Sequence, residues 1–143
     1  MPTIASGFRL SNGVKIPCIG LGTWQIPDDD KLIEDIHDAI NAGYRHIDTA
    51  FIYGNEASVG KAVRTCGLPR EKLFVATKLW NADRGYDAAM RAFETALKKM
   101  ELSYLDLFLI HWPATKGEPM TWQSINSGTW RALEGLYDQG LVR

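Results

Sequence analysis

Residues 73–110, LFVATKLWNADRGYDAAMRAFETALKKMELSYLDLFLI, contain two apolar runs separated by an amphipathic segment. The runs Leu73–Thr77 and Leu105–Ile110 are short and bounded by turn residues, which is typical of buried strands. Between them, one face at helical spacing carries the apolar residues Met90, Phe93, Leu97 and Met100. Strand, helix and strand in this order predict a βαβ unit with parallel strands.

The same alternation continues toward both ends of the chain. Two earlier apolar runs, Ile16–Leu21 and Tyr44–Ile47, predict two further strands. Asp28 and Asn55 are expected to cap the helices that follow these strands, and Gly140 to end the last helix. The apolar helix faces comprise Leu32, Ile33, Ile36, Ala39 and Ile40, then Val59, Ala62, Val63 and Cys66, and finally Trp130, Leu133, Leu136 and Tyr137. The chain therefore repeats a βα unit four times.

The fold class is α/β, and the order of the units leaves two architectures open. In segment 7–15, Asn12-Gly13 lies between alternating apolar residues and predicts a β-hairpin. The four βα units fit either a small open sheet or half of a TIM-type (β/α)8 barrel. A doubly wound nucleotide-binding domain is disfavoured, because the turn at 20–27 lacks the third glycine that leads directly into the helix of such a domain. Segment 113–127 is the one long connection, and such loops often carry function.

The composition excludes several classes of function. A length of 143 residues with 45% hydrophobic residues fits a single domain with a real core. A net charge of −1 gives no electrostatic basis for binding nucleic acid or an anionic membrane. Cys18 and Cys66 form no disulfide framework and have no metal-ligand spacing. Without a signal peptide or membrane span in the pattern, we expect a cytoplasmic protein that binds no metal.

Four polar side chains of reactive types follow the predicted strands. Asp48, Lys78 and His111 each follow an apolar run, and Tyr53 lies five residues beyond Asp48. Taken singly, the aspartate could be a turn residue, the lysine a solvated charge and the histidine a core residue. Because the carboxyl ends of parallel strands meet at one edge, we expect the four to lie together. Three indoles share this edge: Trp24, Trp80 and Trp112.

These residue types together favour proton donation to a carbonyl. Tyr53 alone is a reluctant acid at neutral pH, and an ammonium from Lys78 would stabilise its phenolate. Asp48 would keep Lys78 charged, and His111 could orient the substrate oxygen by a hydrogen bond. Since no side chain supplies a hydride, carbonyl reduction would require a nicotinamide cofactor. The indoles would form an apolar wall around the substrate.

Several ordered motifs resemble those of the aldo-keto reductase superfamily. They are GLGTW (20–24), GYRHIDTA (43–50), YGNE (53–56), VGKA (59–62), ATKLW (76–80) and LIHWP (109–113). The resemblance implies a (β/α)8 barrel whose bottom is closed by an N-terminal hairpin, and reduction of aldehydes and ketones with NADPH rather than NADH. It implies a catalytic tetrad of Asp48, Tyr53, Lys78 and His111, with Tyr53 as the proton donor.

The resemblance also implies which residues bind the two ligands. The residues expected at the cofactor are Gly22, Thr23, Trp24 and Asp48. Those expected at a small-molecule carbonyl substrate are Trp24, Trp80, His111 and Trp112. Met120 and Trp122 are expected to contribute a further pocket wall. Small aldehydes, sugar-derived carbonyls and dicarbonyls are all compatible substrates.

The chain is short for this fold. Such barrels need about 250 residues, so residues 1–143 are expected to form the N-terminal half of one barrel domain. Most of the family's cofactor-binding residues would then lie beyond Arg143. Because a half barrel has two unpaired edges, we expect self-association or pairing with a C-terminal half. The alternatives are an inactive truncated fragment, or a binding or structural protein on the same scaffold.

Overall fold

The computed structural model describes residue 4, residues 6–114 and residues 121–143. The strands are β1 (Gly7–Arg9), β2 (Lys15–Pro17), β3 (Leu21–Gly22), β4 (His46–Asp48), β5 (Phe74–Leu79) and β6 (Leu107–Ile110). The α-helices are α1 (Asp30–Asn41), α2 (Glu56–Thr65), α3 (Tyr86–Met100) and α4 (Trp122–Asp138). Short 3₁₀ turns are η1 (Phe51–Tyr53), η2 (Arg70–Lys72) and η3 (Asn81–Asp83). None of the described helices combines the length and apolar character that crossing a bilayer requires.

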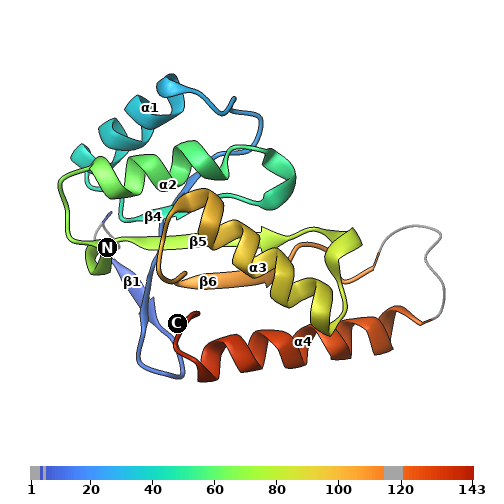
Figure 1. Ribbon diagram of the computed structural model, residues 1–143. Helices are drawn as coiled ribbons and strands as arrows, with labels where there is room; N and C mark the ends of the chain where they lie inside the picture. Colours follow the sequence, from blue (N-terminus) through green and yellow to red (C-terminus); the bar gives the residue numbers. More distant parts are fainter. Residues whose placement is uncertain (1–3, 5, 115–120) are drawn as a thin grey trace.

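The four later strands form one parallel sheet in the order β3-β4-β5-β6, which is also their order along the chain. The helices pack against one another in the same sequence, α1 on α2, α2 on α3 and α3 on α4 (Figure 1). A doubly wound sheet reverses its strand order at a switch point, and none occurs among these strands. The sequential order with a sequential row of helices is that of a (β/α)8 barrel segment.

The core fills the space between this sheet and its helices. Alternate strand residues, Ile47, Val75 and Phe108 among them, join one cluster of buried helix residues. Leu107 and Leu109 therefore face the side of the sheet opposite the helices, and Leu109 is exposed. The helix residues of the core include Leu32, Ile36, Ile40, Val59, Val63, Phe93, Met100, Ala132 and Leu136.

The N-terminal hairpin forms where Asn12-Gly13 predicted it, but it is longer than expected. β1 pairs with β2 in antiparallel fashion, and β2 runs on to Pro17. The prediction of one strand over Ile16–Leu21 was wrong, because its first two residues belong to the hairpin and β3 begins only at Leu21. Cys18 N donates to Ser6 O at 2.9 Å, which extends the hairpin beyond the predicted limit.

The predicted cap of the first helix was wrong, and that of the second was correct in position but not in its side-chain bond. α1 is capped by Asp29, whose Oδ1 accepts from Leu32 N at 3.1 Å. Asp28 instead accepts from Ser58 N at 2.9 Å, in the first turn of α2. Asn55 occupies the N-cap position of α2, yet its side chain makes no capping bond. A local pattern cannot reveal such competition, because the alternative partners come from distant segments.

The C-terminal segment departs from the predicted loop and helix face. α4 begins at Trp122, so residues 122–127 are helical; residues 115–120, including Met120, lie outside the described part. Trp130 and Tyr137 are exposed, while Leu136 is buried. The two exposed rings border an apolar cavity of about 460 Å³ along β6. Its apolar walls are formed by Leu10, Leu107, Phe108, Leu109, Trp130, Leu133, Tyr137 and Val142.

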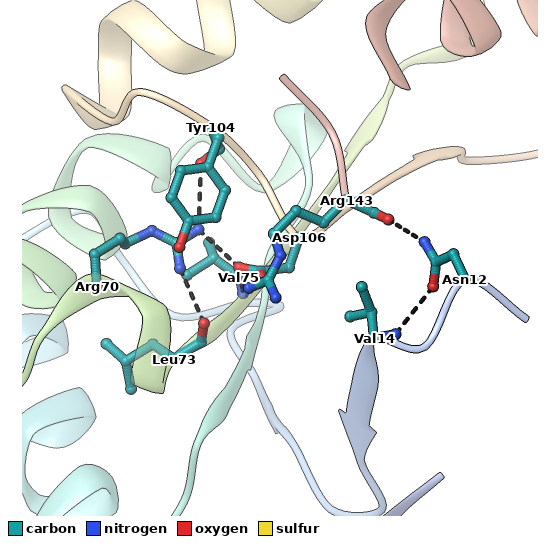
Figure 2. Close-up of polar contacts among 8 residues, drawn as sticks. All are labelled: Asn12, Val14, Arg70, Leu73, Val75, Tyr104, Asp106 and Arg143. Atoms are coloured by element: carbon teal, nitrogen blue, oxygen red, sulfur yellow. Dashed lines mark hydrogen bonds and ion pairs between the residues drawn. The ribbon is translucent and has the colours of Figure 1, made fainter. Parts of the chain in front are cut away.

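A charged cluster closes the amino-terminal end of the sheet (Figure 2). Asp106, which is buried, accepts from Arg70 at 2.7 Å, from Arg143 at 3.0 Å and from the backbone N–H of Val75 at 2.9 Å. Asn12 of the hairpin loop donates to Arg143 O at 2.5 Å. We call Asp106, Arg70 and Arg143 the base cluster; it connects β5, β6, the end of the chain and, through Asn12, the hairpin.

Candidate active site

An ion pair joins the carboxyl ends of two neighbouring strands. Asp48 ends β4 and Lys78 lies near the end of β5, and parallel pairing of these strands brings the two side chains together. Lys78 Nζ donates to Asp48 Oδ2 at 2.6 Å and to the carbonyl oxygen of Thr49 at 2.9 Å. The Lys78 side chain is 15% exposed and that of Asp48 is 32% exposed, so the pair is shielded but reachable. We call Asp48 and Lys78 the rim pair.

Tyr53 and His111 complete the predicted group of four. Tyr53 lies in η1, and Lys78 Nζ is 5.3 Å from the centre of its ring. The rings of Tyr53 and His111 meet edge to face, with centroids 5.9 Å apart. The structure thus brings all four residues together, although they come from three strand ends and a 3₁₀ turn.

The surroundings of His111 favour its neutral form. Burial lowers its pKa below the usual 6.5, the nearby Lys78 ammonium lowers it further, and the Asp48 carboxylate opposes both effects. The Nδ1 atom is buried and has no hydrogen-bond partner among the described residues. A neutral imidazole beside a tyrosine can orient a polar substrate group without adding charge.

Aromatic side chains flank this histidine. The Trp80 ring is perpendicular to the His111 ring at a centroid distance of 5.4 Å, and the Trp112 ring is nearly parallel to it at 6.5 Å. Trp24 lies on the turn after β3 and is 68% exposed, and Trp112 is 54% exposed. Trp80 and Trp112 therefore place apolar surface next to His111.

The turn after β3 lies beside the rim pair. Gly22 pairs with Asp48 in the sheet register, and Thr23 N donates to Asp48 O at 3.0 Å. Gly22 also faces open space, because a Cβ atom there would meet no atom within 4 Å. Three of the four residues expected at the cofactor, Gly22, Thr23 and Trp24, therefore lie beside the fourth, Asp48.

The sequence analysis did not identify two groups that support the rim pair. Thr49 holds Lys78 through its backbone carbonyl, which a residue-type pattern does not reveal. Glu56 is buried behind β5, where Thr77 Oγ1 donates to its Oε1 at 2.8 Å and Lys99 Nζ lies 3.6 Å from its Oε2. The position of Glu56 in the YGNE motif, three residues after Tyr53, was the available signal.

Comparison with known proteins agrees with this geometry. A family model described as "Aldo/keto reductase family" matches residues 18–143. The chain belongs to the aldo/keto reductase family. The 9,11-endoperoxide prostaglandin H2 reductase of Trypanosoma cruzi is 46% identical over 134 residues, which cover 94% of this chain and 44% of that protein.

Two further relatives of this reductase-family chain match all or nearly all of its length. The glyoxal reductase of Bacillus subtilis is 43% identical over 144 residues, covering 100% of this chain and 49% of that protein. The crystal structure of an aldo/keto reductase from Brucella melitensis superposes with a TM-score of 0.88 at 44% identity, covering 99% of this chain and 51% of that one. The chain thus spans about half the length of the relatives it matches, and its fold is that of a partial aldo/keto reductase barrel.

Proposed function

We propose that residues 1–143 form the N-terminal half of one aldo/keto reductase barrel domain. The complete barrel would reduce aldehydes and ketones to alcohols with a nicotinamide cofactor, NADPH rather than NADH by the family resemblance. One observation carries this proposal: the Lys78 ammonium is held by Asp48 and Thr49 against the face of Tyr53.

In this proposal each residue has a separate task. Tyr53 gives its hydroxyl proton to the carbonyl oxygen of the substrate, and the phenolate that remains is stabilised by Lys78. Asp48 keeps that lysine charged and in place, and neutral His111 orients the oxygen by a hydrogen bond. Gly22, Thr23 and Trp24 would hold the nicotinamide with Asp48. When bound, this cofactor supplies the hydride that no side chain can provide.

The apolar surfaces support assignments for the substrate and the partner. Trp80 and Trp112 beside His111 suit a small carbonyl substrate, with Trp24 as a third wall. Among the described residues, β6 is the last strand of the sheet, and the bridge from Leu105 to Val142 lies just before it. The apolar cavity lies along this outer edge. We therefore propose pairing with a C-terminal half barrel, or failing that with a second copy of this chain.

The experiment combines this chain with the C-terminal half of the Bacillus subtilis glyoxal reductase. We call the product the assembled barrel. Oxidation of NADPH by glyoxal or an aromatic aldehyde is expected for wild type and is expected to fall at least about 100-fold in Tyr53→Phe, which lacks the donated proton. NADPH binding, followed by fluorescence, should change little.

Tyr104→Phe is the matched control, because this ring lies at the opposite end of the sheet, 4.1 Å from the Arg70 guanidinium. Equal loss in both variants would contradict the role of Tyr53. An assembled barrel that binds NADPH without turnover would contradict the reductase function, and would favour a binding protein on the same scaffold.

A further inference from the structure

Asn55 is a buried polar residue that the proposed mechanism does not use. It lies between the turn that carries Tyr53 and helix α2, and its side chain is fully buried. The side chain of an asparagine at the start of a helix normally caps it, but the side chain of Asn55 makes no such bond. Its carboxamide instead bonds Thr49 and the turn between Thr23 and Ile26.

All four hydrogen-bonding positions of the carboxamide are used. Nδ2 donates to Thr23 O at 2.8 Å and to Ile26 O at 2.9 Å. Oδ1 accepts from Thr49 Oγ1 at 2.7 Å and from Thr23 Oγ1 at 3.3 Å. The orientation of the amide follows from these partners, because backbone carbonyls only accept and the reversed amide would set oxygen against oxygen.

The two carbonyls that Asn55 binds lie at the ends of the turn carrying Trp24. Within this turn Ile26 N donates to Thr23 O at 3.2 Å, and Gln25 has a φ of 62°. A left-handed conformation is unfavourable for a residue other than glycine, so surrounding contacts must hold it. Asn55 supplies contacts at both ends.

The carboxamide also connects this turn to the rim pair. The Thr49 hydroxyl donates to Asn55, while the carbonyl of the same residue accepts from Lys78 Nζ. A continuous set of hydrogen bonds therefore runs from the Trp24 turn through Asn55 and Thr49 to Lys78.

We infer that Asn55 is a positioning residue for carbonyl reduction. It fixes the Trp24 turn, where cofactor and substrate are expected, relative to the lysine that supports the proton donor. This inference rests on the proposed function. A misplacement of about 1 Å between reacting groups can lower turnover by about 100-fold, so a clamp of this kind has a measurable effect.

The test uses three variants of the assembled barrel. Asn55→Ala removes the clamp. Thr49→Val removes the hydrogen bond from the Thr49 hydroxyl to Asn55 while the side chain keeps nearly the same shape. If Asn55→Ala fails to fold, the result for Thr49→Val tests the inference. Thr129→Val is the control: Thr129 is equally buried and its hydroxyl bonds Gly85 N and Ile125 O, in contact with neither the turn nor the rim pair.

The readout is kcat per NADPH-binding site at saturating aldehyde, because this quantity does not change when a variant merely lowers the folded fraction. We expect a fall of about 100-fold for Asn55→Ala and about 10-fold for Thr49→Val, with Thr129→Val close to wild type. Unchanged kcat per site in Thr49→Val and in a folded Asn55→Ala would overturn the inference.

A second readout is independent of turnover. In the 143-residue chain, hydrogen exchange at the amides of Thr23 and Ile26 should accelerate in both variants while exchange in β5 stays slow. Unchanged exchange at these amides would contradict the inference that Asn55 fixes the Trp24 turn. An assembled wild-type barrel that binds NADPH but reduces no aldehyde would instead overturn the proposed function.

Discussion

At each end of the parallel sheet an aspartate binds a basic side chain. The two sites differ in how exposed the carboxylate is and in how many hydrogen bonds it accepts. In the base cluster, the carboxylate of Asp106 is 1% exposed and accepts from Arg70, Arg143 and a backbone N–H (Figure 2). In the rim pair, the carboxylate of Asp48 is 32% exposed and its side-chain partner is Lys78.

The difference shows how one kind of ion pair can serve structure or chemistry. A saturated, buried carboxylate joins segments of chain, and removing its partners is costly because the charge is left uncompensated. The rim pair lies beside the ring of Tyr53, and both of its side chains retain some exposure to solvent. The two sites should therefore respond in opposite ways to substitution.

The largest expected effect is on turnover at the rim. Lys78→Met should lower kcat/KM of the assembled barrel by at least about 100-fold, because the phenolate of Tyr53 loses its stabilising charge. Lys61→Met is the control. Lys61, in α2, forms an exposed ion pair with Asp30 of α1 at 3.2 Å. Steady-state kinetics would test this, and retained turnover in Lys78→Met would remove the rim pair from the mechanism.

Asp106→Asn tests the structural side of the comparison. This change removes the negative charge that pairs with Arg70 and Arg143, so two guanidinium groups lose their counter-charge. The free energy of unfolding should therefore fall by about 3 kcal/mol. Asp48→Asn should cost less than about 1 kcal/mol, because the rim pair is partly solvated. Urea denaturation of both variants measures the difference; similar losses would mean that the two ion pairs are energetically alike.

The smallest effect concerns the titration of His111. Its pKa is lowered by burial and by Lys78, so Lys78→Met should raise this pKa, and the freed Asp48 charge acts in the same direction. NMR titration of the imidazole protons would report the shift, which Lys61→Met should not produce. A fall of the His111 pKa in Lys78→Met would show that the two side chains are not coupled as described.

The lowered pKa of His111 also makes the free energy of unfolding depend on pH. Because the unfolded chain binds the proton at higher pH than the folded chain, the His111 contribution is complete above about pH 6.5. It is lost as the pH falls through 6.5 toward the folded pKa. The free energy of unfolding should therefore decrease on mild acidification.

Sequence patterns predicted most of the architecture and the group formed by Asp48, Tyr53, Lys78 and His111. Apolar periodicity placed the strands ending in Asp48, Lys78 and His111, and parallel pairing then required these residues to meet. The predictions were wrong where local rules competed with distant partners. Asp28 bonds Ser58 instead of capping α1, and the side chain of Asn55, at the N-cap position of α2, bonds the Trp24 turn instead of the helix.

By itself the sequence determined the βα repeat, the hairpin turn at Asn12-Gly13 and the edge at which reactive side chains gather, because these depend on periodicity and on the direction of parallel strands. Only the tertiary structure decided that Asp106 is saturated, that Thr49 holds Lys78 and that Asn55 clamps a turn 32 residues earlier. A hydrogen bond depends on which atoms meet in space. Between segments so far apart along the chain, packing of the sheet and helices decides that meeting.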